Sequence, residues 1–224
     1  MTRYALSWSG GKDSLLALDR ARARGLKVAA LFTIHEGNSG RVRFHGVRAD
    51  LIRAQAEALG LPLLQAHTHP RDYETVFLEM LDQLPGLGIG GVVFGNIHLT
   101  DIRGWYEERA RARGLDHVEP LWGDAPSDLL REFVARGHVA RIVSVNLALG
   151  RAEWLGRAFD ADLIEAIGAS DVDPCGERGE YHSFSLGGPR FRHAVAVREV
   201  GTLEMEGHRI LDLELAEPAA SPDR

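Results

Sequence analysis

The sequence predicts an α/β protein: a doubly wound, mostly parallel sheet followed by a smaller C-terminal α+β domain. In the first half of the chain, short apolar runs alternate with segments of helical periodicity, which is the pattern of parallel strands joined by crossover helices. The apolar run over 27–34 is continuous, as a strand covered on both faces requires. About the last 40 residues instead alternate with a period of two, which is typical of antiparallel strands.

The first half contains expected strands and helices in alternation. The strands cover 4–8, 27–34, 62–66 and 91–94, and the helices cover 13–24, 47–59, 73–84 and 101–113. In such sheets, ligands bind beyond the carboxyl ends of the strands, at a switch in strand order. We therefore expect the loops over 9–13, after Ile34 and over 95–98 to meet at one ligand.

The second half begins with an apolar corner at 120–123. A helix capped by Asp128, a strand, a broken helix and a hairpin are expected after it, at residues 128–134, 140–145, 155–169 and 202–215. We divide the chain into a first domain, a second domain and a disordered tail, over 1–116, 117–217 and 218–224.

Composition is that of an ordinary globular protein. No apolar run approaches the roughly 20 residues that cross a bilayer, and no secretory signal opens the chain, so we expect a cytoplasmic protein without a membrane partner. The formal net charge of −6 argues against a nucleic-acid partner. The single cysteine, Cys175, excludes an internal disulfide and a cysteine-only metal site. The sequence leaves the oligomeric state open, with a homodimer among the options.

The densest motif of the first half follows the first apolar run and reads Ser9, Gly10, Gly11, Lys12, Asp13 and Ser14. A strand, a glycine-rich turn and a helix start in this order form an anion site, because the first helical N–H groups have no intrahelical partner. Lys12 adds a positive charge, and Asp13 is suited to hold magnesium. The motif differs from the common P-loop, since Asp13 follows Lys12. The alternative is a plain Gly-Gly turn that joins a strand to a helix.

A second dense motif lies near the end and reads Cys175, Gly176, Glu177, Arg178, Gly179, Glu180, Tyr181, His182, Ser183 and Phe184. If Tyr181 begins a strand, Glu180 and His182 point to one side and Tyr181 to the other. Such a pair can shuttle a proton or hold an amine. The alternative is a hydrogen-bonded turn in which His182 is satisfied locally.

Together these motifs resemble those of the diphthine–ammonia ligase family, ATP-binding amidases of the PP-loop (adenine nucleotide alpha hydrolase-like) superfamily. The family carries S-G-G-K-D-S, then Phe-Gly-x-Ile, Pro-Leu-Trp and C-G-E-G-G-E-Y-H-T, which here fall at 9–14, 94–97, 120–122 and 175–183. The resemblance extends over about residues 4–191. Arg178 and Ser183 replace a glycine and a threonine, and 98–101 departs from the usual segment, so the departures fall where a second substrate is expected.

The resemblance implies a HUP-type, Rossmann-like PP-loop domain that binds ATP with Mg²⁺. The expected ATP contacts are Ser9, Gly10, Gly11, Lys12, Asp13, Ser14, Phe32, Thr33, Gly95, Asn96 and Ile97. Asp13 is the expected magnesium ligand, and the expected catalytic residues are Lys12, Asp13, Glu177, Glu180 and His182. The expected contacts to a carboxylate substrate are Trp122, Glu177, Glu180, Tyr181 and His182.

The implied activity is amide formation driven by ATP. A carboxylate attacks the α-phosphorus to give an acyl-adenylate and pyrophosphate, and ammonia then displaces AMP. The motifs leave no residues for a glutaminase domain, so ammonium is the expected nitrogen donor. In the family the carboxylate is that of diphthine, a modified histidine of elongation factor 2. Bacteria lack diphthine, so a bacterial source would imply another carboxylate, such as a small molecule.

Two other classes of protein share such a loop. One is a sensor that binds ATP or AMP, or hydrolyses nucleotide slowly, and it is favoured if Glu177, Glu180 and His182 lie far from the first motif. The other is a PP-loop enzyme that modifies RNA. One cysteine and a net charge of −6 disfavour this second class, because thiolation uses paired cysteines or a cluster and RNA binding uses a basic face.

Overall fold

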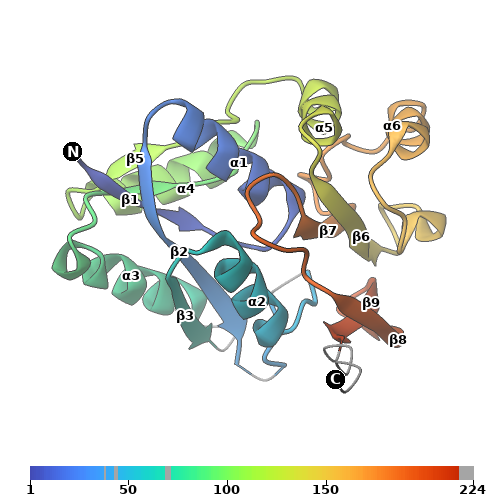
Figure 1. The fold of residues 1–224 in the computed structure, drawn as a ribbon, viewed down its shortest axis with the longest axis horizontal. Coiled ribbons are helices and arrows are strands. Elements are labelled where there is room, and N and C mark those ends of the chain that lie inside the picture. Colours follow the sequence, from blue (N-terminus) through green and yellow to red (C-terminus); the bar gives the residue numbers. More distant parts are fainter. Residues whose placement is uncertain (38, 43–44, 69–71, 217–224) are drawn as a thin grey trace, which may run out of the picture.

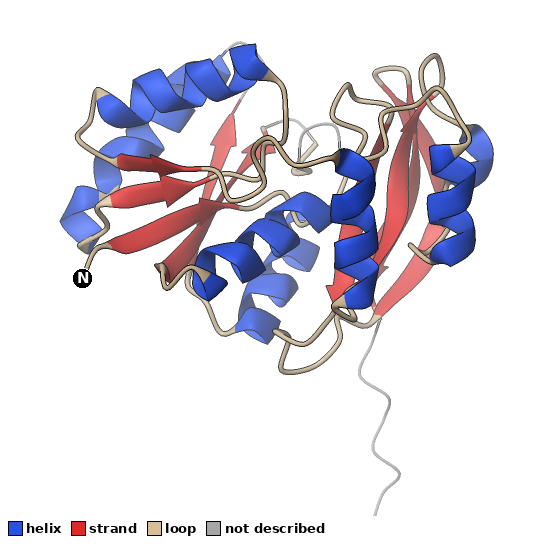
Figure 2. Cartoon of the chain, turned by 90° about the horizontal axis from the view of Figure 1, so that it is seen from above, coloured by secondary structure: helices blue, strands red, loops and turns tan. Residues whose placement is uncertain are grey.

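The computed structural model describes residues 1–37, 39–42, 45–68 and 72–216, so the expected tail over 218–224 lies outside it. A parallel sheet with helices on both faces forms the first half of the molecule, and an antiparallel sheet with helices beside it forms the second (Figures 1 and 2). No helix among the described residues is long and apolar enough to span a membrane.

The first sheet has the order β3-β2-β1-β4-β5, and all neighbouring strands are parallel. Its strands are β1 (Arg3–Ser7), β2 (Lys27–Glu36), β3 (Leu63–Thr68), β4 (Gly91–Val93) and β5 (Asp116–Val118). Its helices are α1 (Lys12–Ala23), α2 (Ala49–Leu59), α3 (Tyr73–Gln83), the short 3₁₀ helix η2 (Pro85–Leu87) and α4 (Thr100–Arg111). The predicted doubly wound α/β fold is confirmed.

The two faces of this sheet pack against different helices. Leu6 and Leu31 belong to an apolar cluster with side chains of α1 and α2, whereas Ala5 and Phe32 belong to a second cluster with side chains of α3 and α4. The chain proceeds outward from β1 to β3 and then returns to β4 on the other side of β1. The switch in strand order therefore lies between β1 and β4, and residues 9–14 and 94–97 follow their carboxyl ends.

The second sheet has the order β7-β6-β9-β8 and is antiparallel. Its strands are β6 (Val139–Asn146), β7 (Tyr181–Gly187), β8 (Val197–Met205) and β9 (His208–Leu215). The helices of this half are α5 (Pro126–Ala135), the 3₁₀ helix η3 (Ala152–Trp154) and α6 (Ala161–Gly168). The smaller α+β half and its C-terminal hairpin are therefore confirmed.

Two sequence-based expectations for individual elements were wrong. Strand β5 was missed because it has only three residues, none of them fully buried, so it gives no apolar run. Asp128 does not cap α5: the cap is Ala125, Pro126 opens the helix, and Asp128 lies in the first turn. The proposed domain boundary at 116 falls inside β5, which pairs with the first sheet.

Helix α1 joins the two halves. The Ser185 amide of β7 donates to the Gly10 carbonyl (2.8 Å), and the Gln55 side chain donates to the carbonyls of Gly10 (3.0 Å) and Ser185 (2.6 Å). On the buried side of α1, Asp19 accepts from His138 (2.8 Å) and Arg190 (2.6 Å). The second half of the chain is thereby fixed against the start of α1.

Candidate functional site

Two adjoining cavities of about 300 Å³ each lie where β1, β2 and β4 end. The first, here called the aromatic cavity, is lined among others by Trp8, Phe32, Thr33, Ile34, Val42 and Tyr73. The second, here called the loop cavity, is lined among others by Lys12, Asp13, Ser14, Gly95, Asn96, Cys175, Glu177, Tyr181 and Ser183. Residues common to both are Ser7, Ser9, His45, Tyr106 and His182. The cavities therefore form one cleft, and both sequence motifs reach it.

The 9–14 loop has the backbone that an anion site requires. Gly10 has a φ of +82°, and a Cβ there would lie 2.6 Å from Ile52 Cδ1, so only glycine fits. The Ser14 hydroxyl donates to the Gly11 carbonyl (2.9 Å), and the Gly11 amide donates to Ser9 Oγ (3.3 Å). Helix α1 then begins at Lys12 with its N-terminus at the loop cavity.

The second half of the chain reaches the mouth of this helix. The Lys12 amide donates to Ser183 Oγ of β7 (3.0 Å), so one of the first N–H groups of α1, which have no acceptor within the helix, bonds to the second half of the chain. Gly95 packs on the other side: a Cβ there would lie 3.1 Å from the Asp13 carbonyl oxygen. The absence of a side chain at Gly95 thus allows close contact with the start of α1, and Gly95, an expected ATP contact, also lines the loop cavity. The loop cavity remains open between these two contacts.

The Lys12 side chain is buried and lines the loop cavity. Its Nζ donates to Asp13 Oδ2 (3.0 Å) and to the Cys175 carbonyl, and it lies 5.0 Å from the centre of the Tyr181 ring. Burial by itself lowers the pKa of Lys12, but the surrounding acidic groups, Asp13 first among them, together outweigh burial and raise the pKa above the ordinary value. Lys12 is therefore protonated at neutral pH, with its charge beside the Asp13 carboxyl group.

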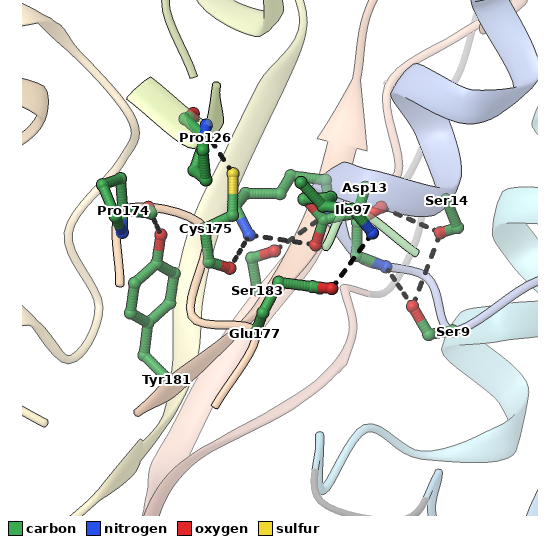
Figure 3. A network of polar contacts seen from close by, with 12 residues as sticks. Ser9, Asp13, Ser14, Ile97, Pro126, Pro174, Cys175, Glu177, Tyr181 and Ser183 are labelled. Atoms are coloured by element: carbon green, nitrogen blue, oxygen red, sulfur yellow. Dashed lines mark hydrogen bonds and ion pairs between the residues drawn. The ribbon is translucent and has the colours of Figure 1, made fainter. Parts of the chain in front are cut away.

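Glu177 faces the same cavity from the opposite wall. Its Oε2 accepts a hydrogen bond from the Ile97 amide (3.2 Å), which ties the 175–183 segment to the loop after β4 (Figure 3). Burial and the nearby Asp13 charge raise the pKa of Glu177 to about 7. The carboxyl group therefore changes charge near neutral pH.

Glu180, in contrast, lines neither cavity. Its buried carboxylate accepts from the amides of Asp173 (2.9 Å) and Arg178 (3.0 Å), and so holds the turn together. Tyr181 does begin β7, but it is Tyr181 and His182 that line the cleft, contrary to the predicted pairing of Glu180 with His182. The β6–β7 register shifts between Ile142 and Ser144, opposite Ser183 and His182, so simple alternation fails here.

The remaining predicted residues are spread around the cleft. Phe32 and Thr33 line the aromatic cavity, and Asn96 lines the loop cavity while donating to the buried Glu119 (2.7 Å). Ile97 contributes its amide to Glu177. Trp122 lines neither cavity and packs on the Arg103 guanidinium, 4.5 Å from its ring centre.

The lining residues that were not predicted include His45, Tyr73 and Tyr106. The tyrosines lie on α3 and α4, and their hydroxyls approach to 3.3 Å. The sequence predicted helices over 73–84 and 101–113 but assigned no site residue to either. His45 lies between the predicted strand at 27–34 and the predicted helix at 47–59. No local pattern marks any of them, because the sheet topology alone brings them to the cleft.

The acidic groups of the loop cavity suit a cation that takes most of its ligands from water and from the phosphates of a bound substrate. Asp13 and Glu177 both line it, but the described residues contain no group of three or more His, Cys, Asp or Glu side chains that could hold a metal ion. Mg²⁺ commonly keeps several waters and binds through one or two carboxylates plus substrate phosphates. The donor set fits that mode of binding.

Comparison with known proteins identifies the family. The model of the diphthamide synthase N-terminal domain matches residues 2–117, and that of the C-terminal domain matches residues 125–216. The chain is 30% identical over 220 residues to diphthine–ammonia ligase of Mus musculus, covering 87% of this chain and 82% of the relative. It is 27% identical over 226 residues to the Homo sapiens protein of that name, with the same coverage.

A solved structure, the U34-tRNA thiolase NcsA of Methanococcus maripaludis with its [4Fe-4S] cluster, superposes with a TM-score of 0.38 at 17% identity, over 60% of this chain and 56% of the thiolase. This superposition is too loose to support an argument about the site. The matches to the two domain models, in contrast, extend over both halves of the chain and include both motifs. The chain belongs to the diphthamide synthase family, to which the diphthine–ammonia ligases also belong.

Proposed function

We propose that the protein is an ATP-dependent ligase that forms an amide through an acyl-adenylate, with ammonia as the nitrogen donor. One observation carries the proposal: the 9–14 loop and the 175–183 segment, whose nearest ends are 161 residues apart in the sequence, line the same cavity. The relatives are named diphthine–ammonia ligases, which fits this chemistry. A sensor would need only the nucleotide half of this cleft.

The cleft has a place for each part of ATP. The Thr33 and Phe32 wall of the aromatic cavity takes the adenosine, and the mouth of α1 takes the β- and γ-phosphates. Lys12 and the loop amides neutralise the pyrophosphate as it leaves, which is the main contribution expected from fixed donors. Mg²⁺, held by Asp13 and the phosphates, would neutralise further phosphate charge.

The second substrate enters from the 175–183 side. Tyr181 and His182 line the cleft there and position the carboxylate for attack on the α-phosphorus. Glu177 binds the ammonium ion and receives its first proton, so that ammonia is the nucleophile. Glu180 acts indirectly, through the turn that it holds. The carboxylate is that of diphthine on elongation factor 2, with a small-molecule carboxylate as the alternative.

The products test this proposal. The protein is incubated with α-labelled ATP, ammonium and elongation factor 2 carrying diphthine, and in parallel with a panel of small carboxylates. AMP and pyrophosphate, formed together with an amide, are expected with one acceptor. ADP as the product, or no turnover with any acceptor, would favour the sensor or slow hydrolase. Turnover that required glutamine and ignored ammonium would exclude ammonia as the donor.

A further inference from the structure

The reacting atoms of the proposed ligase belong at the junction of the two cavities. In ATP the α-phosphate stands between the ribose and the β-phosphate. With adenosine in the aromatic cavity and pyrophosphate in the loop cavity, the α-phosphorus and the acyl-adenylate bond lie beside the residues common to both. These residues are Ser7, Ser9, His45, Tyr106 and His182.

Among them, His45 has a ring nitrogen with a defined role. Its Nδ1 lies 3.2 Å from the Ser183 carbonyl oxygen. A carbonyl oxygen only accepts, so Nδ1 carries the hydrogen, and Nε2 of the neutral ring is then an acceptor. Among the described residues, no hydrogen bond to Nε2 is formed. The contact with Ser183 thus fixes the tautomer and leaves the basic nitrogen for a ligand.

The ring is also held in place on its faces. It packs against His182 with ring centres 4.5 Å apart and ring planes tilted by 35°, and its Cε1 approaches Gly11, where a Cβ would lie 3.1 Å away. His45 therefore lies over the 9–14 loop, between the two halves of the molecule. It comes from the segment between β2 and α2, which neither motif includes.

The surroundings keep this ring neutral. Burial lowers the pKa of His45 to about 4; the Ser183 carbonyl opposes the shift, and Lys12 of α1 adds to it. His182 of β7 faces the ring and is itself held neutral, because burial and the neighbouring His45 and His208 lower its pKa. At neutral pH the His45 ring is therefore neutral, and it can accept a proton from an acidic donor.

We propose that His45 is a catalytic residue of the amide-forming half-reaction, a role that rests on the proposed function. Ammonia attacks the carbonyl carbon of the acyl-adenylate, and its lone pair forms the C–N bond. The C–O bond to AMP breaks, and its electron pair leaves with the phosphate oxygen. The proton that the nitrogen must lose passes to His45 Nε2 and from there to water. After the attack this nitrogen carries a positive charge and is acidic, so a weak base is sufficient to remove its proton.

Separate assays of the two half-reactions test this role. The probe carboxylate is diphthine on elongation factor 2, or the small carboxylate that supports turnover. ATP–pyrophosphate exchange reports activation, and amide formation with ammonium reports transfer. In His45→Ala and His45→Asn, we expect exchange within about 3-fold of wild type and transfer lowered about 100-fold. Asn retains a donor for Ser183 but places nothing at Nε2, so it separates the base from the packing.

Rescue by imidazole distinguishes a proton acceptor from a residue that only supports the structure. Added imidazoles are expected to restore transfer in His45→Ala, at rates that follow the imidazole pKa. His193→Ala, at an exposed histidine away from the cleft, is the control and should match wild type in both assays.

Four results would overturn the role of His45: transfer within 3-fold of wild type in His45→Asn, equal losses of exchange and transfer, no rescue by any imidazole, or rescue independent of pKa. A wild-type protein inactive in both assays with every acceptor would instead overturn the proposed function.

Discussion

The 9–14 loop and the 175–183 segment line one cavity, but different interactions hold them. The loop is shaped by its own backbone, through the left-handed Gly10 and the short bond from Ser14 to Gly11. The segment is shaped by buried carboxylates: Glu180 accepts from two amides, and Asp173 Oδ1 accepts from the Cys175 amide (2.9 Å). Acidic residues near a site therefore need not act on substrate, since here some of them build the wall.

The largest effect is expected at Lys12, the positively charged residue of the 9–14 loop. Lys12→Ala removes the cation that faces Asp13 and Glu177 and lies against the Cys175 carbonyl. We expect pyrophosphate release to fall by at least about 100-fold, because a fixed donor to the leaving phosphate is lost. Lys27→Ala, at the exposed start of β2, is the matched control. Near-wild-type release in Lys12→Ala would show that the loop amides suffice.

Glu180 tests the structural side of the comparison. Glu180→Ala leaves the buried amide of Asp173 and the partly buried amide of Arg178 without their acceptor, so the free energy of unfolding should fall by about 3 kcal/mol. Urea denaturation measures the change, and Glu108→Ala, with an 80% exposed side chain, is the control. Wild-type stability together with a large loss of turnover would instead make Glu180 a substrate contact.

Glu177 both lines the loop cavity and bonds to the backbone, and its contribution to the free energy of unfolding depends on pH. Folding raises the pKa of Glu177 from the ordinary value of 4.5 to about 7. Between pH 4.5 and pH 7, the carboxyl group is therefore protonated in the folded protein but ionised in the unfolded chain. Wild-type stability is therefore penalised as pH rises from 4.5 to 7, and Glu177→Gln removes the penalty.

Without nucleotide or metal, we expect Glu177→Gln to match wild type at pH 4 and to be more stable by about 1–2 kcal/mol at pH 8. Gln keeps an acceptor for the Ile97 amide, so the contact itself is preserved. Urea titrations at both pH values measure the difference. A pH-independent difference would mean that the carboxyl group titrates normally.

Much of the fold was predictable because its signals are local. Continuous apolar runs marked β2 and β4, and helical periodicity with a closing glycine marked α1 and α2. Strand β5 was not predictable, since three partly exposed residues gain their order only by pairing with β4. The hairpin of β8 and β9 was found through its alternation, although β8 begins earlier than the predicted strand at 202.

The site divides in the same way. The motif at 9–14 predicted a backbone conformation that depends on few neighbours, and the cavity at α1 agrees with it. The β6–β7 register shift and the burial of Glu180 determine which side chains of the second motif face the cavity. The local sequence pattern predicts neither of these features. His45 and Tyr106 reach the cleft from segments far apart in the chain, so only the folded topology identifies them.

The smallest effect is expected at Trp122, which the sequence suggested as a substrate contact. It lies outside both cavities, and its ring packs on Arg103. Trp122→Leu should cost about 0.5–1 kcal/mol of stability through the lost cation–π contact and leave the KM for the carboxylate within twofold of wild type. Steady-state kinetics with varied acceptor measure this. A fivefold rise in that KM, with ATP binding unchanged, would extend the acceptor site beyond the two cavities to the 120–123 corner.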